Sequence, residues 1–432
     1  MNLELSVSTA DIGREMHRLM AELYPICRSI TGHGVRLSLN SLRQHIPLEI
    51  HEVPTATTVF DWTIPKEWNI KDAYVKNSDG HRIIDFNRSN LHVLNYSVPF
   101  KGRIRLEDLK SHLFTLPDLP ESIPYRTSYY KETWGFCMAH KDFLKLEDGE
   151  YDVLIDSSLE PGHLSYGEYF IQGKSDDEIL LTCHICHPSL CNDNLSGIAL
   201  ATFLAKELSS LRLRYSYRFL FIPGTIGSIT WLARNEERVS RIKHGLVLAC
   251  VGDSGKFTYK KSRRGDAEID RAALYMLKQS GQGYDIDEFS PYGYDERQFC
   301  SPGFNLPVGC FMRTPHGRFP EYHTSADDLE FVRPEYLAES FSQCFSVLKL
   351  LEGNQKYMTQ NPKCEPQLGK RGLYQAIGGQ QGKTNELAML WVLNYSDGNH
   401  TLLDIADRSG LNFDLVKSAA DMLSAHDLLR PC

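Results

Sequence analysis

The sequence predicts an α/β protein: a layered sheet with helices on both faces, a small inserted β-rich domain, and a helical tail. Three observations support this fold class. Apolar strand-like runs alternate with helix-spaced segments through most of the chain, short β-rich pieces interrupt them early, and a polar stretch precedes the tail. A length of 432 residues leaves room for two or three domains with a large core.

The N-terminal part of the sequence predicts two helices followed by a β-rich region. Residues 11–27 carry apolar side chains at helical spacing, and residues 34–45 form a second such segment after Thr31-Gly32. We assign residues 49–116 to an inserted β-rich domain because short β-rich pieces alternate there with Gly, Asn, Asp and Pro turns. The expected strand pieces are residues 53–59, 81–86 and 92–98.

Residues 1–48 and 117–353 are predicted to form the main α/β body. Its strand-like runs alternate with helical segments, a pattern typical of a layered sheet. The expected strands are residues 178–183, 218–222, 246–251 and 308–312, and the expected helices are residues 196–209, 227–237 and 268–280.

The end of the chain resembles a winged helix joined through a linker. Residues 354–383 are assigned to the linker and residues 384–432 to the winged helix-turn-helix domain, with helices at 384–394, 401–409 and 413–426. From Lys383 onward there are seven acidic and four basic residues, whereas binding to DNA phosphates needs the opposite balance. Nucleic acid is therefore not an expected partner. Contact with another protein or packing in a homo-oligomer is expected instead.

Composition favours a cytoplasmic enzyme. A net charge of −8 disfavours general binding to nucleic acid or to an anionic membrane surface. No apolar run approaches the roughly 20 residues that span a bilayer, and the N-terminus lacks the pattern of a signal peptide. The eleven cysteines are scattered and are expected to be reduced thiols. Cys183 and Cys186 form a Cys-x-x-Cys without a second pair, which favours a structural role over a four-sulfur zinc site.

The most informative motif follows the first expected strand of the main body. His184 and His187 stand at its end, Asp193 follows within Asn-Asp-Asn-Leu-Ser-Gly, and a helix begins next. Ligands of open α/β sheets bind at the carboxyl ends of strands. Histidine nitrogen and aspartate oxygen are ligands that catalytic zinc takes. This loop therefore predicts a metal site.

Two further loops support the metal site. Asp253 follows the strand-like run that ends near residue 251, and His323 follows the run at residues 308–312. A lone acid or histidine in a loop is usually only solvated. Three such loops follow three expected strands. This pattern favours a shared zinc site with three protein ligands and one open position.

The loop from His184 to Asp193 and the loop with His323, together with residues 223–228 and 294–299, resemble the co-catalytic zinc aminopeptidases. They resemble more closely the bacterial aminopeptidase-like family found with polysaccharide-biosynthesis genes. The resemblance covers essentially the whole chain and implies a zinc-aminopeptidase-like layered sheet, an inserted β-rich domain and a C-terminal winged helix. The matching segments are residues 183–197, 223–228, 294–299 and 321–327.

The resemblance implies a set of metal ligands. Asp193 would be a ligand, bridging if two ions bind, with Asp253 and His323 as further ligands. The resemblance does not distinguish which of two histidines is the first ligand. His184 stands at the strand end, where the aminopeptidase histidine normally lies and which we favour, whereas His187 is nearer the aspartate.

One departure from the family pattern concerns proton transfer. Gly224 stands where the family has the acidic general base, and Thr225 stands where the wider aminopeptidases have a glutamate ligand of the second zinc. We therefore expect one zinc to bind more readily than two, and activity to be weak unless a base is restored by Gly224→Glu. Glu321, near His323, is the candidate replacement for the base.

Several polar residues near the metal motifs are candidates for substrate binding. An acid among them could hold a free α-amino group, and an arginine could bind a carboxylate or phosphate. The candidates for substrate binding are Tyr294, Asp295, Glu296, Arg297 and Tyr322, with Arg263, Arg264, Arg313 and Arg318 as further arginines.

The resulting hypothesis is a zinc-dependent aminopeptidase-like hydrolase. It would cleave a peptide or amide bond in a small substrate, and the family association suggests a polysaccharide or cell-envelope precursor. The alternative is a binding or scaffold protein that keeps the aminopeptidase fold, with Gly224 as the feature in its favour. A transcription regulator is a weaker third hypothesis, because the tail is acidic.

Overall fold

The computed structural model of the protein describes residues 8–373 and 380–432, with side chains from residue 385 in the second range. The chain divides into two compact units, one up to Phe345 and one from Ser346 onward. Each unit is described by itself.

The first unit is built on an eight-stranded sheet with the strand order β1-β10-β12-β11-β13-β16-β14-β15. Its strands are β1 (Glu49–Pro54), β10 (His163–Ile171), β11 (Glu178–His184), β12 (Ser216–Ile222), β13 (Ile242–Leu248), β14 (Phe257–Lys260), β15 (Tyr284–Asp287) and β16 (Val308–Met312).

Four neighbouring strands, β12, β11, β13 and β16, run parallel at the centre of this sheet. Every residue of β11, β12 and β16 is buried. Strands that are covered on both faces consist of nearly continuous apolar residues, and these segments show that pattern in the sequence. Because the strands are parallel, their carboxyl ends meet at one edge of the sheet, where the loops with His184, Gly224 and Asp253 begin.

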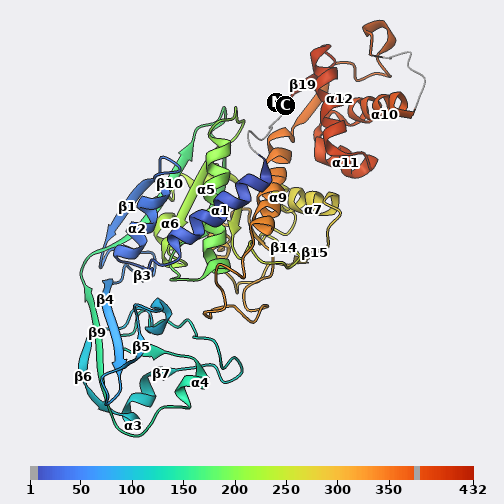
Figure 1. Ribbon diagram of the computed structural model, residues 1–432. Coiled ribbons are helices and arrows are strands. Elements are labelled where there is room, and N and C mark those ends of the chain that lie inside the picture. The colour runs from blue at the N-terminus through green and yellow to red at the C-terminus, as the bar shows by residue number, and fades with distance from the viewer. Residues whose placement is uncertain (1–7, 374–379) are drawn as a thin grey trace. The chain divides into compact units, whose positions relative to one another are not determined.

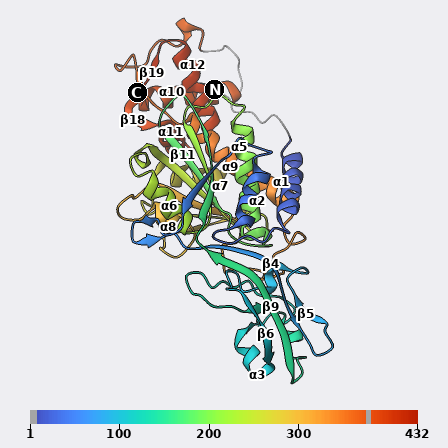
Figure 2. The ribbon, with the colours of Figure 1, turned by 90° about the vertical axis from the view of Figure 1, so that its left-hand side faces the viewer.

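Helices cover the sheet much as the periodicity predicted (Figures 1 and 2). Helix α5 contacts α1 and strands β11, β12 and β13, and α7 contacts β13 to β16. Ser8 caps α1 by accepting a hydrogen bond from the backbone of Asp11. The main helices are α1 (Thr9–Leu23), α2 (His33–Leu42), α5 (Ser196–Leu208), α6 (Ile226–Arg234), α7 (Glu268–Gln279), α8 (Glu296–Phe299) and α9 (Pro334–Gly353).

A second sheet of four strands, with the order β5-β4-β9-β6, forms the inserted lobe. The long strands β4 (Glu67–Lys76) and β9 (Glu150–Glu160) lie side by side in both views (Figures 1 and 2). Strands β5 (Arg82–Asp85) and β6 (Phe100–Arg105) flank them. Short elements complete the lobe: β7 (Leu113–Phe114), β8 (Phe136–Cys137), α3 (Leu106–Leu109) and α4 (His140–Phe143). The hairpin of β2 (Thr58–Val59) and β3 (Trp62–Thr63) contacts helix α6 of the main body instead.

The predicted boundaries of the inserted domain, residues 49 and 116, need correction. Strand β1 begins at residue 49 but pairs with β10 in the main sheet, whereas β9 at residues 150–160 belongs to the four-stranded sheet. The piece at 53–59 is divided between β1 and β2, and residues 92–98 form isolated bridges but no strand. Local composition indicated where the β-rich segment begins. Which sheet a strand joins depends on pairing with strands about a hundred residues away, which local composition does not show.

The second unit combines three helices with a three-stranded sheet of order β18-β17-β19. Thr401 and Asp404 form a capping box at α11, which ends at the left-handed Gly410, and Asn412 caps α12. The helix-turn-helix that the sequence predicted at residues 401–426 is thus present. Its elements are β17 (Lys356–Thr359), α10 (Gln380–Tyr395), β18 (Asp397–Thr401), α11 (Leu402–Ser409), α12 (Phe413–Ala425) and β19 (Leu429–Pro431).

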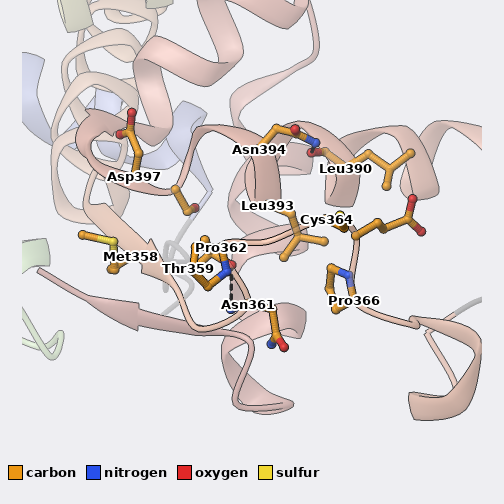
Figure 3. A pocket seen from close by; sticks show the side chains of 12 residues that line it. Met358, Thr359, Asn361, Pro362, Cys364, Pro366, Leu390, Leu393, Asn394 and Asp397 are labelled. Atoms are coloured by element: carbon orange, nitrogen blue, oxygen red, sulfur yellow. Dashed lines mark hydrogen bonds between the residues drawn. The ribbon is translucent and has the colours of Figure 1, made fainter.

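The predicted linker at residues 354–383 also needs correction, because β17 within it is the central strand of this sheet. A cavity of about 370 Å³ lies beside the segment after β17 and is lined by Pro362, Pro366, Leu390 and Leu393 among others (Figure 3). Its lining includes no histidine, so it does not share the chemistry of the metal motifs. In the described part of the chain, no helix is long and apolar enough to cross a membrane.

Candidate metal centre

The loop after β11 is held in place by two asparagines. The Asn192 side chain accepts a hydrogen bond from the Gly252 amide at 2.8 Å, and the Asn194 side chain accepts one from the Cys250 amide at 3.2 Å. Asn194 also donates to the carbonyl of Leu248 at 3.0 Å. The Asn-Asp-Asn motif therefore ties the loop after β11 to the loop after β13, and Asp193 between them is held rigidly.

A third loop supports Asp193 through Asp327. The Asp327 carboxylate accepts hydrogen bonds from the backbone amides of Asn192 at 2.5 Å and of Asp193 at 2.9 Å. This explains why the last motif contains an aspartate four residues after His323: the acid orients the loop and contributes no visible ligand atom.

Asp193 is completely buried and faces three histidines. Its Oδ1 lies 2.9 Å from Nε2 of His184, and its Oδ2 lies 2.9 Å from Nε2 of His323 and 3.7 Å from Nε2 of His187. The ligand atoms of His184, His187 and Asp193 all lie within 4.8 Å of one another. The structure thus brings together four of the five predicted metal-binding residues.

The charges in this cluster depend on one another. Burial raises the pKa of Asp193, but the neighbouring His187 imidazole, the hydrogen bond with His184 and the close approach of His323 more than offset this effect, so the pKa lies well below its usual value. Burial lowers the pKa of His187 well below its usual value, despite the nearby Asp193 carboxylate. Asp193 is therefore ionised and His187 neutral, which are the forms that bind a metal.

Two atoms of the cluster indicate a place for a cation. Oδ2 of Asp193 and Nε2 of His323 are buried, and neither has a hydrogen-bond partner among the described residues, although they lie only 2.9 Å apart. Buried polar atoms without partners are costly and call for an explanation. A metal ion that both atoms ligate satisfies them, so these residues fit a zinc site.

Tyr294 completes the cluster on the other side of Asp193. Its hydroxyl donates to Oδ1 of Asp193 at 2.9 Å and lies 3.3 Å from Sγ of Cys250, and its ring stacks on His184 with centroids 4.6 Å apart. Burial raises the pKa of Tyr294 well above its usual value, and the Asp193 charge adds to this. Tyr294, predicted as a substrate-binding residue, is therefore a protonated donor to the Asp193 carboxylate.

The prediction of Asp253 as a ligand is not supported by its position. Its carboxylate accepts hydrogen bonds from Asn192, from the Gly255 amide and from both the amide and hydroxyl of Thr314. All of these contacts secure the loop. The side chain after β13 that does reach the cluster is that of Cys250, three residues earlier, which sequence reasoning missed.

Gly224 lies beside a carboxylate that the sequence did not place there. A Cβ on Gly224 would lie 3.4 Å from Oδ2 of Asp295 and 3.2 Å from Cβ of His184. Asp295 is fully buried; its Oδ1 accepts from the Ser228 hydroxyl at 2.7 Å, and its Oδ2 has no partner among the described residues. Burial raises the pKa of Asp295 to about 6, although the nearby His184 and the Ser228 hydrogen bond act in the opposite direction.

The other predicted substrate-binding residues and the predicted base Glu321 differ in their contacts. Glu296 is buried in an ion pair with Lys260 at 2.8 Å, and Tyr322 stacks on His323 with ring centroids 3.9 Å apart. Arg297 follows in α8, and its buried Nε has no partner among the described residues. The carboxylate of Glu321 makes no contact with the cluster in the described part of the chain, so the structure does not support it as the base.

The other arginines and the Cys-x-x-Cys have structural contacts. Arg313 is buried and pairs with Glu339, while exposed Arg318 pairs with Asp287. Arg263 and Arg264 both bond to Asn305. All eleven cysteines are free thiols. Cys183 and Cys186 are buried, which agrees with the structural interpretation.

Two residues far from the motifs support the centre, and no sequence signal marks either of them. Tyr125, from the long segment between β7 and β8, places its ring 5.0 Å from the rings of both His187 and His323. Arg28 is almost completely buried, and its Nε donates to the carbonyl of His187 at 2.8 Å. Both act through packing or backbone contacts that appear only in the folded chain.

Comparison with known proteins agrees with this geometry. The family described as a domain of unknown function, DUF4910, matches residues 17–354, and a winged helix-turn-helix family matches residues 355–431. A Clostridium acetobutylicum protein, named as a candidate polysaccharide biosynthesis protein with an aminopeptidase-like domain, is 55% identical over 424 residues, 98% of each chain. The winged-helix match begins near β17, in agreement with the corrected boundary.

Solved structures show the same fold. A candidate peptidase from Clostridium acetobutylicum superposes with a TM-score of 0.93 at 54% identity, covering 98% of this chain and 97% of the other. A zinc aminopeptidase from Bacillus subtilis superposes with a TM-score of 0.58 at 13% identity, covering 80% and 95%. The second likeness concerns the fold alone, and the chain has the aminopeptidase-like architecture that the motifs predicted.

Proposed function

The chain belongs to the DUF4910 family of aminopeptidase-like proteins, and on that premise we propose that it is a metal-dependent hydrolase of amide bonds. One observation carries the proposal: a buried, ionised Asp193 faces three histidines, and two of the facing atoms have no hydrogen-bond partner among the described residues. A structural histidine cluster would satisfy its buried atoms internally.

Three donor atoms would hold the ion: Oδ2 of Asp193, Nε2 of His187 and Nε2 of His323. Three protein donors with one open position are typical of catalytic zinc. When bound, zinc polarises a carbonyl and lowers the pKa of water to near 7. Tyr294, by donating to Oδ1 of Asp193, keeps the carboxylate oriented with Oδ2 toward the ion.

Asp295 supplies the carboxylate that Gly224 lacks. Its unpartnered Oδ2 lies 3.4 Å from the point where a side chain at position 224 would begin, so it approaches the place of the family's general base from another loop. At Oδ2 it would accept a proton from the attacking water and return it to the leaving amine. The Ser228 hydroxyl, bonded to Oδ1, holds the carboxylate in this orientation.

The substrate is proposed to be a peptide or an amide on a polysaccharide precursor. The relative's name supports the polysaccharide context. We assign the binding of a free amino group to half-buried Glu321, two residues before His323, because Asp295 is the proposed base and Glu296 is paired with Lys260. A free amino terminus would then be required for cleavage.

The test is hydrolysis by purified full-length protein loaded with zinc. Aminoacyl amides, the same amides blocked at the amino group, and amide-bearing amino sugars form the panel, with Asp193→Asn as the inactive control. Turnover that requires zinc and Asp193 supports the proposal. A protein that holds zinc but cleaves none of these amides would favour the alternative of a scaffold that keeps the fold, for which Gly224 is the supporting feature.

A further inference from the structure

We infer that this centre is mononuclear: Asp193, His187 and His323 hold one ion on the Oδ2 side, while His184 and Tyr294 close the Oδ1 side as hydrogen-bond donors. The inference rests on the proposed metal dependence and assigns each histidine a role. Of the two histidines that the sequence left open, it makes His187 the ligand, whereas the sequence favoured His184 at the end of the strand.

The role of His184 follows from the orientation of Asn194. The Cys250 amide donates to Oδ1 of Asn194 and the Leu248 carbonyl accepts from its Nδ2, so the two ends of this amide group are distinguished. Nδ2 of Asn194 lies 3.3 Å from Nδ1 of His184. An amide NH₂ can only donate, so Nδ1 of His184 must accept.

The proton of neutral His184 therefore lies on Nε2, which faces Oδ1 of Asp193 at 2.9 Å. A protonated nitrogen has no lone pair for a metal. A metal on Nε2 would require a proton on Nδ1, pointing at the Asn194 NH₂ group. His184 is thus a donor to the ligand Asp193 and does not itself ligate.

His187 has the opposite arrangement. The Cys186 sulfur lies 3.8 Å from the carbonyl of Gly224, which can only accept, and 3.3 Å from Nδ1 of His187. We assign the thiol proton to the carbonyl, and the sulfur then accepts from Nδ1 of His187. Nε2 of His187 then keeps its lone pair and faces Oδ2 of Asp193, as does Nε2 of His323. A metal-binding histidine typically donates through its other ring nitrogen in this way.

Two hydrogen-bond donors, His184 and Tyr294, occupy the Oδ1 side of Asp193 where a second ion would bind. The Tyr294 hydroxyl lies within hydrogen-bonding distance of Oδ1 and of Cys250, the cluster side chain after β13, and its ring covers His184. Asp253 and Thr225 do not replace the missing ligands: Asp253 is engaged by Asn192, Gly255 and Thr314, and threonine is a poor zinc ligand.

Zinc stoichiometry and anomalous diffraction test the inference without any substrate. Full-length protein dialysed after zinc loading should retain one ion per chain. A zinc-edge anomalous map should show one peak, beside Oδ2 of Asp193 and between His187 and His323. Two peaks that flank Asp193 would overturn the inference but leave the proposed function standing, whereas absence of bound zinc would overturn both.

The same substitution at the two histidines provides a matched pair. His187→Gln removes a ligand, and zinc affinity should fall more than 100-fold. His184→Gln keeps an N–H that can reach Asp193, so one zinc should remain, with less than a tenfold loss of affinity. Equal losses in both variants, with metal-free melting temperatures like that of the parent, would show that His184 is a ligand after all.

Discussion

The backbone amide of Tyr125 donates a hydrogen bond to the carbonyl of His323 at 2.7 Å. The contact belongs to a short pairing of two chain segments, in which Pro124 bridges to Thr324 and the Ser325 amide donates to the carbonyl of Ile123. His323 has a positive φ of 56°, an unusual conformation for a non-glycine residue. The segment between β7 and β8 thus holds His323, a proposed metal ligand, in its place.

Replacement of the Tyr125 ring should weaken metal binding. In Tyr125→Ala the rings of His187 and His323 lose a packing neighbour, and we expect roughly a tenfold weaker zinc affinity and about 3–5 kcal/mol lower stability. Tyr125→Phe loses only the hydrogen bond to Tyr129, at about 1 kcal/mol, and should bind zinc normally. Isothermal titration and urea unfolding measure both effects. Unchanged zinc affinity in the alanine variant would contradict this role.

Asp295 should be needed for turnover but not for metal binding. Asp295→Asn removes the proposed proton acceptor, and kcat should fall by about 10²–10⁴-fold on any amide that the parent cleaves. One zinc per chain should remain, because Asp295 makes no contact with the proposed ligands Asp193, His187 or His323 in the described structure. Steady-state rates at saturating zinc, with elemental analysis, decide; a variant that turns over like the parent would exclude Asp295 as the base.

An acidic side chain at position 224 should raise the rate of hydrolysis only when the Asp295 carboxylate has been removed, as in Asp295→Asn. The sequence predicted a gain from Gly224→Glu alone, but a Cβ there lies 3.2 Å from Cβ of His184 and 3.4 Å from Oδ2 of Asp295. The new side chain is crowded, and two carboxylates in one buried place repel each other. We expect Gly224→Glu to lower activity in the parent and to recover part of it in Asp295→Asn.

Gly224→Ala in the Asp295→Asn background is the matched control for that experiment, because it adds the crowding without the carboxylate. Recovery by alanine as large as by glutamate would mean that proton transfer is not what the glutamate restores. Rates of the four variants on one amide, measured at equal zinc loading, separate the two effects.

The ion pair between Arg36 and Glu67 should make stability depend on pH. Burial raises the pKa of Glu67, but hydrogen bonds from Arg36, Asn69 and the His163 amide lower it to about 2 overall. Because this value is below the ordinary 4.5, the stabilisation is complete above pH 4.5 and is lost as the pH falls toward 2.

Glu67→Gln should therefore cost roughly 1–3 kcal/mol at pH 7, and the difference from the parent should shrink by on the order of 1 kcal/mol near pH 3.5–4. Urea unfolding across this pH range measures it. Glu150→Gln, which touches only an exposed pair with Arg103, is the control and should have no effect at any pH. A pH-independent difference for Glu67→Gln would show that packing, not charge, is what it loses.

The full-length protein should not bind duplex DNA tightly at physiological salt. Lys417 is the basic residue of α12, and it is engaged by Asp421 at 2.5 Å, while Asp414 adds a further negative charge. A helix that enters the major groove needs free positive charge for the phosphates. Fluorescence anisotropy with a random duplex should give no sub-micromolar binding. Sub-micromolar binding that weakens steeply with salt would overturn this prediction.

Local sequence determined the elements that depend on near neighbours. The strand at residues 308–312 and the helices that became α5, α7, α11 and α12 were predicted within one or two residues, because their apolar spacing and caps are local properties. The same holds for Asp193 and His323, which lie in the loops that follow buried strands, in motifs dense with metal-binding residue types. Sequence was therefore enough to predict the aminopeptidase-like fold and most of the cluster.

Only the tertiary structure distinguishes the roles that we propose for these residues. His184 and His187 are three residues apart and chemically identical, and they differ because Asn194 faces one ring and Cys186 the other. Asp295 reaches the place of Gly224 from a loop about seventy residues later, and β9 joins the lobe across a similar span. Hydrogen-bond direction and strand pairing depend on neighbours in space, and such neighbours exist only once the chain has folded.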